Sequence, residues 1–294
     1  MDGAALAARV RAGLRDDVAA VGEIGLATVL VGDDPASQIY IRHKHAGAQD
    51  VGIRPFDKRL PTDTSEEDVL ELVAELNADE TVDGILVQTP LPDHIDEARV
   101  MRTIEPVKDV DGLHPFNGGQ LFFGRPTLVG ATPVGIMRLL TEYRVLVEGA
   151  RAVVVGRSLI VGKPVAMLLL QANATVTICH SRTDDLQRQT LDADILVAAV
   201  GIPGLVVPDM VKTGATVLDV GITRTDAGLV GDVDPAVSEV AAYLTPVPGG
   251  VGPMTIACLL ENAVRAARYR RGLLPWPGPL PAEARAVPTG EPPS

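Results

Sequence analysis

Aromatic side chains are scarce in this chain. Phe, Trp and Tyr make up only 3% of its 294 residues, whereas hydrophobic residues as a whole make up 46%. The interior must therefore be built from Ala, Val, Leu and Ile, the side chains that fill parallel sheets covered by helices on both faces. The composition predicts an α/β fold, and the length predicts about two domains.

Cysteine is also scarce. Cys179 and Cys258 lie far apart and form no Cys-x-x-Cys pair, so neither a disulfide framework nor a zinc site is indicated. The five histidines show no metal-ligand spacing with carboxylates or cysteines. We expect no metal site, and a reducing compartment such as the cytoplasm.

Positive charge is in deficit, with a net charge of −12. Nucleic acids and anionic membranes bind basic surfaces, so neither is an expected partner, although a local basic pocket is compatible with this composition. Long apolar runs are absent as well, and Arg9, Arg11 and Arg15 interrupt any signal-peptide core. We expect a cytoplasmic protein without a membrane segment.

Helices and strands alternate along the first 130 residues. Apolar residues recur every four positions from Leu6 to Val18, which predicts an opening helix. Asp34 followed by Pro35 predicts the start of another helix. The expected strands are Leu26–Val31, Ile53–Leu60 and Gly84–Val87, and the expected helices between them are Pro35–Asp50 and Glu66–Asn77. This alternation is typical of a parallel sheet.

A change of composition divides the chain. Residues 108–130 are rich in Gly, Pro and Phe without periodicity, which predicts a loop that is either a linker or an active-site wall. The strand Ala152–Val155, Gly156, a helix and the strand Thr175–Cys179 then form a β-turn-α-β pattern. We therefore predict one domain at 1–130 with a returning helix at 253–272, a second domain at 131–252, and a proline-rich disordered tail at 273–294.

The second domain carries a possible nucleotide site. A strand that ends at Gly156 before a helix can present backbone N–H groups to a pyrophosphate. The loop lacks the usual Gly-x-Gly-x-x-Gly spacing, so a plain helix-start turn is the alternative, but Arg157 and Ser158 favour phosphate. The second strand continues into Cys-His-Ser-Arg-Thr without the acidic residue of NAD sites. Hydroxyls and an arginine suit a 2′-phosphate, which favours NADP over NAD.

The first domain carries a different set of polar residues. Tyr40 and Lys44 stand four apart on one face of a predicted helix, and Gln88 follows a buried strand at its carboxyl end, where parallel sheets bind ligands. Alone, a helical lysine is usually a surface charge. Asp109 and Asp111 are either ligand-binding groups or turn formers. The run 246–253 is either a tight turn or a wall against a flat ligand.

Six motifs in order resemble the bifunctional methylenetetrahydrofolate dehydrogenase/methenyltetrahydrofolate cyclohydrolase family. The resemblance covers about residues 2–271, and its motifs are Val31–Ser37 with Tyr40 and Lys44, Gly84–Gln88, Lys108–Gly112, Val155–Ser158, Ile160–Pro164 and Pro248–Thr255. Ala131 and Thr89 depart from residues that the family often has, Cys and Leu, and the tail has no counterpart. None of these departures removes a residue that the family uses in chemistry.

The resemblance implies an activity and a fold. The activity is NADP-dependent oxidation of 5,10-methylenetetrahydrofolate to 5,10-methenyltetrahydrofolate and its hydrolysis to 10-formyltetrahydrofolate, in one-carbon metabolism and purine biosynthesis. The fold is an N-terminal parallel-sheet α/β catalytic domain and a Rossmann-like nucleotide-binding domain, with a C-terminal helix packing back on the first and a homodimer formed through the second. The alternatives are another NADP-linked two-domain dehydrogenase acting on a small acid or amino acid, and a non-catalytic folate- or nucleotide-binding module.

The resemblance also implies residue roles. Tyr40 stacks on the aminobenzoyl ring, Lys44 is the central catalytic group, Gln88 tunes it, and Asp111 holds the pterin. As a base, Lys44 would need a pKa lowered from about 10.4 to roughly 7 to 8. The implied folate contacts are Tyr40, Lys44, Val87, Gln88, Asp111, Pro248, Gly249, Gly250, Val251 and Gly252, and the implied NADP contacts are Gly156, Arg157, Ser158, Ser181 and Ile222.

Overall fold

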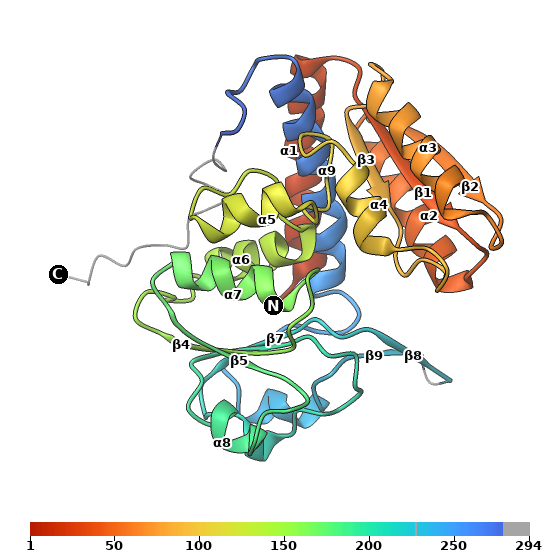
Figure 1. Cartoon of the computed structure of the whole chain (residues 1–294). Coiled ribbons are helices and arrows are strands. Elements are labelled where there is room, and N and C mark those ends of the chain that lie inside the picture. The colour runs from red at the N-terminus through yellow and green to blue at the C-terminus, as the bar shows by residue number, and fades with distance from the viewer. Residues whose placement is uncertain (227, 279–294) are drawn as a thin grey trace. The chain divides into compact units, whose positions relative to one another are not determined.

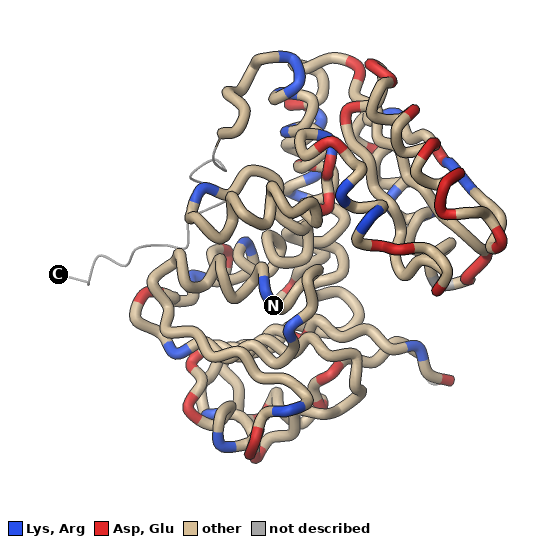
Figure 2. The backbone as a smooth tube through the Cα atoms, viewed as in Figure 1, with Lys and Arg blue, Asp and Glu red and all other residues tan. Residues whose placement is uncertain are grey.

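The computed structural model describes residues 1–226 and 228–278. Within them the chain forms two compact units, each with one parallel sheet (Figure 1). Of the described residues, the three-strand unit comprises 8–131 and 256–278, and the five-strand unit comprises Met1–Ala7 and Thr132–Thr255. Figure 2 shows acidic and basic residues interspersed along the backbone of both units. No helix in the described ranges is long and apolar enough to cross a membrane.

The three-strand unit contains the predicted alternation of helices and strands. Its elements are α1 (Gly3–Val21, from Ala8 on), β1 (Gly25–Val31), α2 (Pro35–Asp50), β2 (Arg54–Leu60), α3 (Glu66–Ala78), β3 (Gly84–Val87), α4 (Glu97–Thr103), α5 (Pro115–Phe122) and most of α9 (Val251–Arg270). The side chain of Asp34 caps α2 by accepting a hydrogen bond from Ser37 N at 2.7 Å. The predicted helix at 35–50 is confirmed with these bounds.

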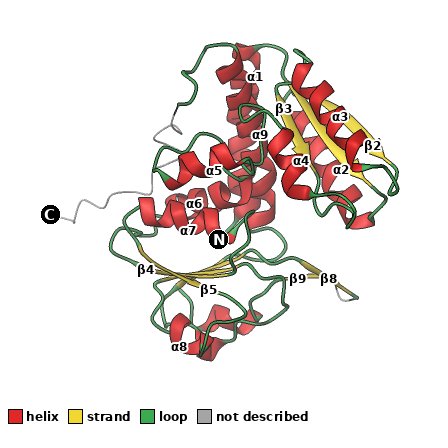
Figure 3. Cartoon of the chain, viewed as in Figure 1, coloured by secondary structure: helices red, strands yellow, loops and turns green. Residues whose placement is uncertain are grey.

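The sheet of this unit has the order β2-β1-β3, with all pairs parallel. Every residue of β1 is buried, because helices cover both faces of the sheet (Figure 3). Ala27, Val29 and Val31 belong to one apolar cluster with residues of α3 and α4. Thr28 points to the other face and contacts His45 of α2.

The five-strand unit is also α/β. Its elements are α6 (Ala131–Glu142, from Thr132 on), β4 (Arg151–Val155), α7 (Gly162–Gln171), β5 (Thr175–Cys179), α8 (Leu186–Thr190), β6 (Ile195–Ala198), η1 (Pro208–Met210), β7 (Thr216–Asp219), β8 (Thr223–Thr225), β9 (Gly228–Val230), η2 (Pro235–Glu239) and β10 (Tyr243–Leu244). The parallel sheet has the order β10-β7-β6-β4-β5, and β8 and β9 form a separate antiparallel hairpin. The two sheets confirm the predicted fold class.

Two sequence-based predictions need correction. Residues 108–130 are not all loop, because α5 forms within them; Pro115 occupies its first turn and the His114 ring accepts a hydrogen bond from Phe116 N at 3.0 Å. Residues 273–278 of the predicted disordered tail have a defined place, since the Trp276 ring lies 4.9 Å from that of Tyr269. The rest of that tail, residues 279–294, lies outside the described residues.

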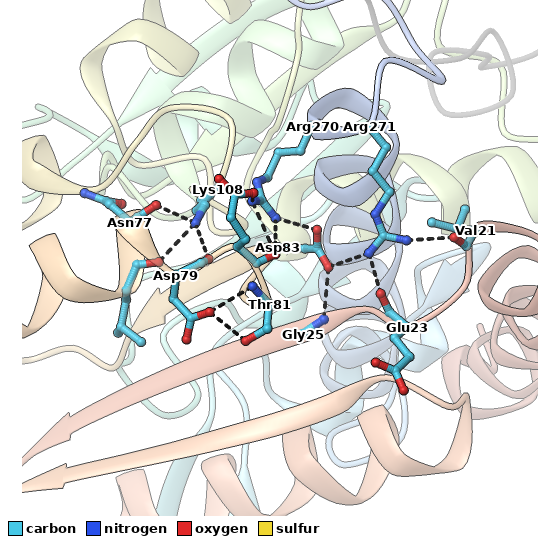
Figure 4. A network of polar contacts seen from close by, with 12 residues as sticks. Val21, Glu23, Gly25, Asn77, Asp79, Thr81, Asp83, Lys108, Arg270 and Arg271 are labelled. Atoms are coloured by element: carbon cyan, nitrogen blue, oxygen red, sulfur yellow. Dashed lines mark hydrogen bonds and ion pairs between the residues drawn. The ribbon is translucent and has the colours of Figure 1, made fainter.

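The end of α9 is fixed to the three-strand unit by a buried carboxylate (Figure 4). Asp83, which is 1% exposed, accepts hydrogen bonds from Arg270 at 2.6 Å, from Arg271 at 2.9 Å and from Gly25 N at 3.1 Å. Arg271 also donates to the Val21 and Glu23 carbonyls. One acidic side chain thus joins the returning helix to the start of β1, as the predicted packing of that helix on the first domain requires.

Replacing Asp83 with Ala should destabilise the three-strand unit by about 2 to 3 kcal/mol, because the buried Gly25 N–H and the partly exposed Arg270 and Arg271 lose their shared acceptor. The expected measurement is a lower urea midpoint for this unit. The matched control is Glu80→Ala, because Glu80 pairs with the same Arg270 at 2.8 Å but is 93% exposed. The control should shift the free energy of unfolding by no more than about 1 kcal/mol. Equal shifts would contradict the role of Asp83.

Candidate active site

Lys44 and Gln88 form the centre of the candidate site. The ammonium group of Lys44 donates a hydrogen bond to Gln88 Oε1 at 3.0 Å, and the Gln88 amide donates to the Thr89 carbonyl at 2.8 Å. The second contact fixes which side of the Gln88 amide faces Lys44. Both side chains are half-buried, and Tyr40, one helical turn before Lys44, is 41% exposed.

The strand order explains why these residues meet. From the central strand β1 the chain passes to β2 on one side and then to β3 on the other, so the loops after β1 and β3 diverge at the carboxyl edge. Helix α2 leaves the first of these ends and Gln88 leaves the second. Asp109 forms a parallel β-bridge with Ile85 of β3. The chain after Asp109 therefore runs in the direction of β3 and brings Asp111 toward the same edge of the sheet.

Burial and charge act on the two ionisable groups in opposite directions. Desolvation lowers the pKa of Lys44, and the nearby Asp111 carboxylate partly opposes this shift. Desolvation also raises the pKa of Asp111, and Lys44 partly opposes that shift. Burial thus favours the neutral amine over the ammonium form, which is the direction a general base requires.

A buried network fixes the segment that leads to Asp111. Asp109 Oδ2 accepts hydrogen bonds from His114 N and from the Asn117 amide, both at 2.8 Å. Asn117 Oδ1 in turn accepts from Thr127 Oγ1 at 2.8 Å. From the sequence, Asp109 is either a ligand-binding group or a turn former, and nothing singles out Asn117 or Thr127, because isolated polar residues in an aperiodic stretch give no periodic signal. The structure makes Asp109 a structural acceptor.

Two further contacts support the site from neighbouring elements. Asn262 of α9 donates to the carbonyls of Val110 and Val129, at 2.8 and 2.7 Å, and so fixes the chain directly before Asp111. Thr28 Oγ1 and His45 Nε2 lie 2.6 Å apart, which attaches α2 to β1 one residue beyond Lys44. Neither contact was predicted from the sequence.

In the turn after β4 of the five-strand unit, the main chain at Gly156 lies very close to a neighbouring loop. Gly156 has a φ of +124°, and a Cβ there would lie 2.3 Å from the Ala199 carbonyl oxygen. Ser158 Oγ accepts hydrogen bonds from Val161 N and Gly162 N at 3.1 and 3.3 Å, so it satisfies two main-chain donors where α7 begins. An uncluttered turn before the positive end of a helix fits a dinucleotide pyrophosphate.

The remaining predicted residues differ in exposure. Arg157 and Ser181 are exposed and Ile222 is 38% exposed, so all three are accessible to a nucleotide. Val87 and Val251 are buried, at 2% and 3% exposure, so a folate contact there would come from the main chain. In the predicted folate loop, Pro248 is exposed, Gly249 and Gly252 are half-buried, and Gly250 is buried.

Comparison with known proteins identifies the family. Residues 1–111 match the model of the tetrahydrofolate dehydrogenase/cyclohydrolase catalytic domain, and residues 130–271 match that of its NAD(P)-binding domain. The chain belongs to the tetrahydrofolate dehydrogenase/cyclohydrolase family. It is 57% identical over 247 residues to the bifunctional protein FolD of Methanoculleus marisnigri, which covers 83% of this chain and 87% of the relative.

Solved structures of family members share the fold. The bifunctional enzyme FolD of Campylobacter jejuni is 46% identical, with a TM-score of 0.90, and the match covers 92% of this chain and 98% of that one. The methylenetetrahydrofolate dehydrogenase-cyclohydrolase of Trypanosoma brucei, solved with NADP and an inhibitor, is 40% identical, with a TM-score of 0.88 and coverage of 93% and 97%. The family's NAD(P)-binding domain in this chain thus includes the whole of the sheet that carries Gly156.

The buried Asp109 gives a pH-dependent prediction. Burial raises the pKa of Asp109 to about 6, although hydrogen bonds from Asn117 and His114 oppose the shift. A raised pKa means that the folded protein binds this proton more tightly than the unfolded chain does, so the stability it contributes is present at low pH and is lost as pH rises through about 6. Between pH 4.5 and 7.5, the free energy of unfolding of the wild type should fall by about 2 kcal/mol more than that of Asp109→Asn. Urea unfolding of both proteins at the two pH values measures this, and a constant difference would contradict it.

Proposed function

We propose that this protein oxidises 5,10-methylenetetrahydrofolate with NADP and hydrolyses the 5,10-methenyl product to 10-formyltetrahydrofolate. The observation that carries the proposal is the half-buried Lys44–Gln88 pair with Asp111 nearby, in a chain whose two halves match the family's catalytic and nucleotide-binding domains. A dehydrogenase for a small acid or amino acid does not account for the match of both halves, and a non-catalytic module does not account for the desolvated lysine.

The hydrolytic step needs the lysine. Water adds its oxygen to the cationic methenyl carbon and gives one proton to a base, which leaves a hydroxyl on that carbon; one carbon–nitrogen bond then breaks as the hydroxyl loses its proton to become the formyl carbonyl, and the freed nitrogen takes up a proton. Lys44 is the proposed base, because desolvation already lowers its pKa and the positive substrate lowers it further. Gln88 accepts a hydrogen bond from the Lys44 amine and so orients it. We assign the aminobenzoyl ring to Tyr40 and the pterin to Asp111.

The redox step needs positioning more than acid or base strength. NADP, when bound, supplies the acceptor for a hydride from the methylene carbon. We assign its pyrophosphate to the turn from Gly156 to Ser158 and its 2′-phosphate to the exposed Arg157 and Ser181. Ile222 is the proposed contact to the remainder of the nucleotide, and the loop from Pro248 to Gly252 is the proposed main-chain wall against the folate.

One coupled assay tests the function. The purified protein is given methylenetetrahydrofolate with NADP or NAD, and the reduced nucleotide and the methenyl product are followed together. We expect nucleotide reduction and then decay of the methenyl absorbance. A protein that reduces NADP with a small acid or amino acid but gives no methenyl signal would overturn the proposal.

Substituting Met for Lys44 should separate the two activities. Met preserves much of the apolar stem but lacks the amine, so hydrolysis of purified methenyltetrahydrofolate should fall by about 10² to 10⁴-fold while the dehydrogenase falls less. The two activities are measured independently on the same preparation. Equal losses would show that Lys44 mainly holds the substrate, and unchanged hydrolysis would remove it from the mechanism.

Arg157→Ala should raise the KM for NADP about tenfold or more, because a charged contact to the 2′-phosphate contributes roughly 1.5 to 3 kcal/mol. Turnover with NAD, which lacks that phosphate, should change little. The side chain is exposed, so the substitution should leave the fold intact. Equal losses with both nucleotides would place Arg157 at the pyrophosphate or in a structural role.

We also propose a homodimer formed through the five-strand unit. Strand β5 is the edge of its sheet and leaves Thr175, Thr177 and Ile178 exposed, with Leu170 of α7 at 53% exposure beside them in the chain. An edge with unpaired backbone groups and apolar neighbours is suited to pairing with a second copy.

The product 10-formyltetrahydrofolate is a one-carbon donor, which supports the assignment to purine biosynthesis. The cytoplasmic location stays a prediction from the sequence.

A further inference from the structure

The five-strand unit contains two buried carboxylates that the proposed chemistry does not use. Asp219 ends β7 and Asp232 follows the β8–β9 hairpin, and their exposures are 4% and 0%. A buried carboxylate is costly unless it accepts hydrogen bonds. The groups that donate to these two therefore show what they hold in place.

Asp232 holds the turn that follows β6. Its Oδ2 atom accepts hydrogen bonds from Val200 N at 2.6 Å and from Gly201 N at 3.1 Å. This turn touches the proposed pyrophosphate turn, because a Cβ on Gly156 would lie 2.3 Å from the Ala199 oxygen and 3.5 Å from a methyl carbon of Val200. A shift of the turn after β6 would therefore reach Gly156 directly.

The strand order places this turn at the nucleotide site. From β4 the chain passes to β5 on one side and afterwards to β6 on the other. The loops after β4 and β6 thus diverge, and a parallel sheet binds its ligand in the crevice between two such loops. This rule assigns one wall of such a crevice to Gly156 and the other to Val200 and Gly201.

Asp219 holds Asp232 in turn. Its Oδ1 accepts a hydrogen bond from Asp232 N at 2.8 Å, and its Oδ2 accepts one from Val233 N at 3.1 Å. Two glycines make room for the carboxylates: a Cβ on Gly221 would lie 2.0 Å from Asp232 Oδ1, and one on Gly231 would lie 1.8 Å from Asp219 Oδ2. The hydrogen bonds thus link Asp219 to Asp232 and Asp232 to the turn after β6, and the two glycines leave no space for a larger residue beside either carboxylate.

We propose that Asp232 is a positioning residue for the nicotinamide nucleotide, which holds the turn 199–201 in the form that binds it, and that Asp219 fixes Asp232. The inference rests on the proposed function and extends it to a residue that lies behind the site. Asp232 acts through the two backbone N–H groups, because its side chain is fully buried and directed to them. Its role is to preform one wall of the crevice before the nucleotide arrives.

The test is Asp232→Ala compared with Asp232→Asn. Alanine removes the acceptor, whereas asparagine retains one oxygen for Val200 and Gly201. Alanine should raise both the KM for NADP and the Kd for NADPH, measured by its fluorescence without folate, by about tenfold or more. Asparagine should restore both to within about threefold of the wild type. Hydrolysis of methenyltetrahydrofolate without nucleotide should stay within about twofold in both variants, because its proposed base is Lys44 in the other unit.

Asp234→Ala is the matched control. Asp234 lies two residues away, is half-buried and accepts a hydrogen bond from Ala236 N at 2.8 Å at the start of η2, so it loses a comparable contact outside the crevice. Its NADPH affinity should equal that of the wild type. Unchanged NADPH affinity in Asp232→Ala, or an equal loss in Asp234→Ala, would overturn the proposal.

If Asp232→Ala does not fold, the NADPH affinity of Asp219→Asn tests the proposal instead. This variant leaves the Asp232 carboxylate intact but replaces one of the two acceptors that fix its backbone, so NADPH should bind about threefold to tenfold more weakly. Affinity equal to the wild type would then overturn the inference. The outcome is separable from the proposed function, because NADPH binding is measured without folate and without turnover.

Discussion

A parallel sheet whose first strand lies in the middle sends the chain to opposite sides of that strand, and the loops at the carboxyl ends must then diverge. Both units obey this constraint, with β1 between β2 and β3 and with β4 between β5 and β6. The diverging loops leave main-chain groups and side chains without a neighbouring layer to cover them. The residues assigned to chemistry in each unit leave such strand ends, Lys44 on the helix after β1, Gln88 after β3 and Gly156 after β4.

Loops that diverge need internal support, and buried acceptors supply it here. Asp109 accepts hydrogen bonds from a main-chain N–H and a side-chain amide just before Asp111. Asp232 accepts hydrogen bonds from two main-chain N–H groups of the turn after β6, and Asp219 accepts two from the segment that contains Asp232. Burial raises the pKa of both Asp109 and Asp219 to about 6, although the hydrogen bonds that they accept oppose the shift. Because this value is below 7, each side chain is mostly ionised at neutral pH. Free energy of folding is thus given up at these positions in exchange for fixed loop geometry.

The sequence predicted the elements that periodicity and caps define. Helix α2 follows from Asp34 and Pro35, and the strands follow from short apolar runs between polar segments. The meeting of Lys44 with Gln88 also follows, because a residue after a parallel strand lies at the carboxyl edge. Helix α5 was missed, since its glycines and aromatics have low helix propensity and its stability comes from the Asn117 contacts. Buried acceptors such as Asp232 were missed because, in a sequence, an acid in a turn is indistinguishable from a solvated turn former.

The opposed pKa shifts of Lys44 and Asp111 connect the two proposed reactions. Burial lowers the pKa of the amine, while the attraction of the Asp111 carboxylate keeps part of its proton affinity. Hydride removal turns the neutral methylene bridge of the folate into a methenyl cation, and a positive charge beside Lys44 lowers its pKa further. In the proposed sequence, the first reaction therefore creates the electrophile for water and also shifts Lys44 further toward the neutral amine that can accept a proton from that water. The hydrogen bond that Lys44 donates to Gln88 holds the amine in place for both steps. We therefore propose that the oxidation of the folate itself prepares Lys44 to act as the base of the hydrolysis.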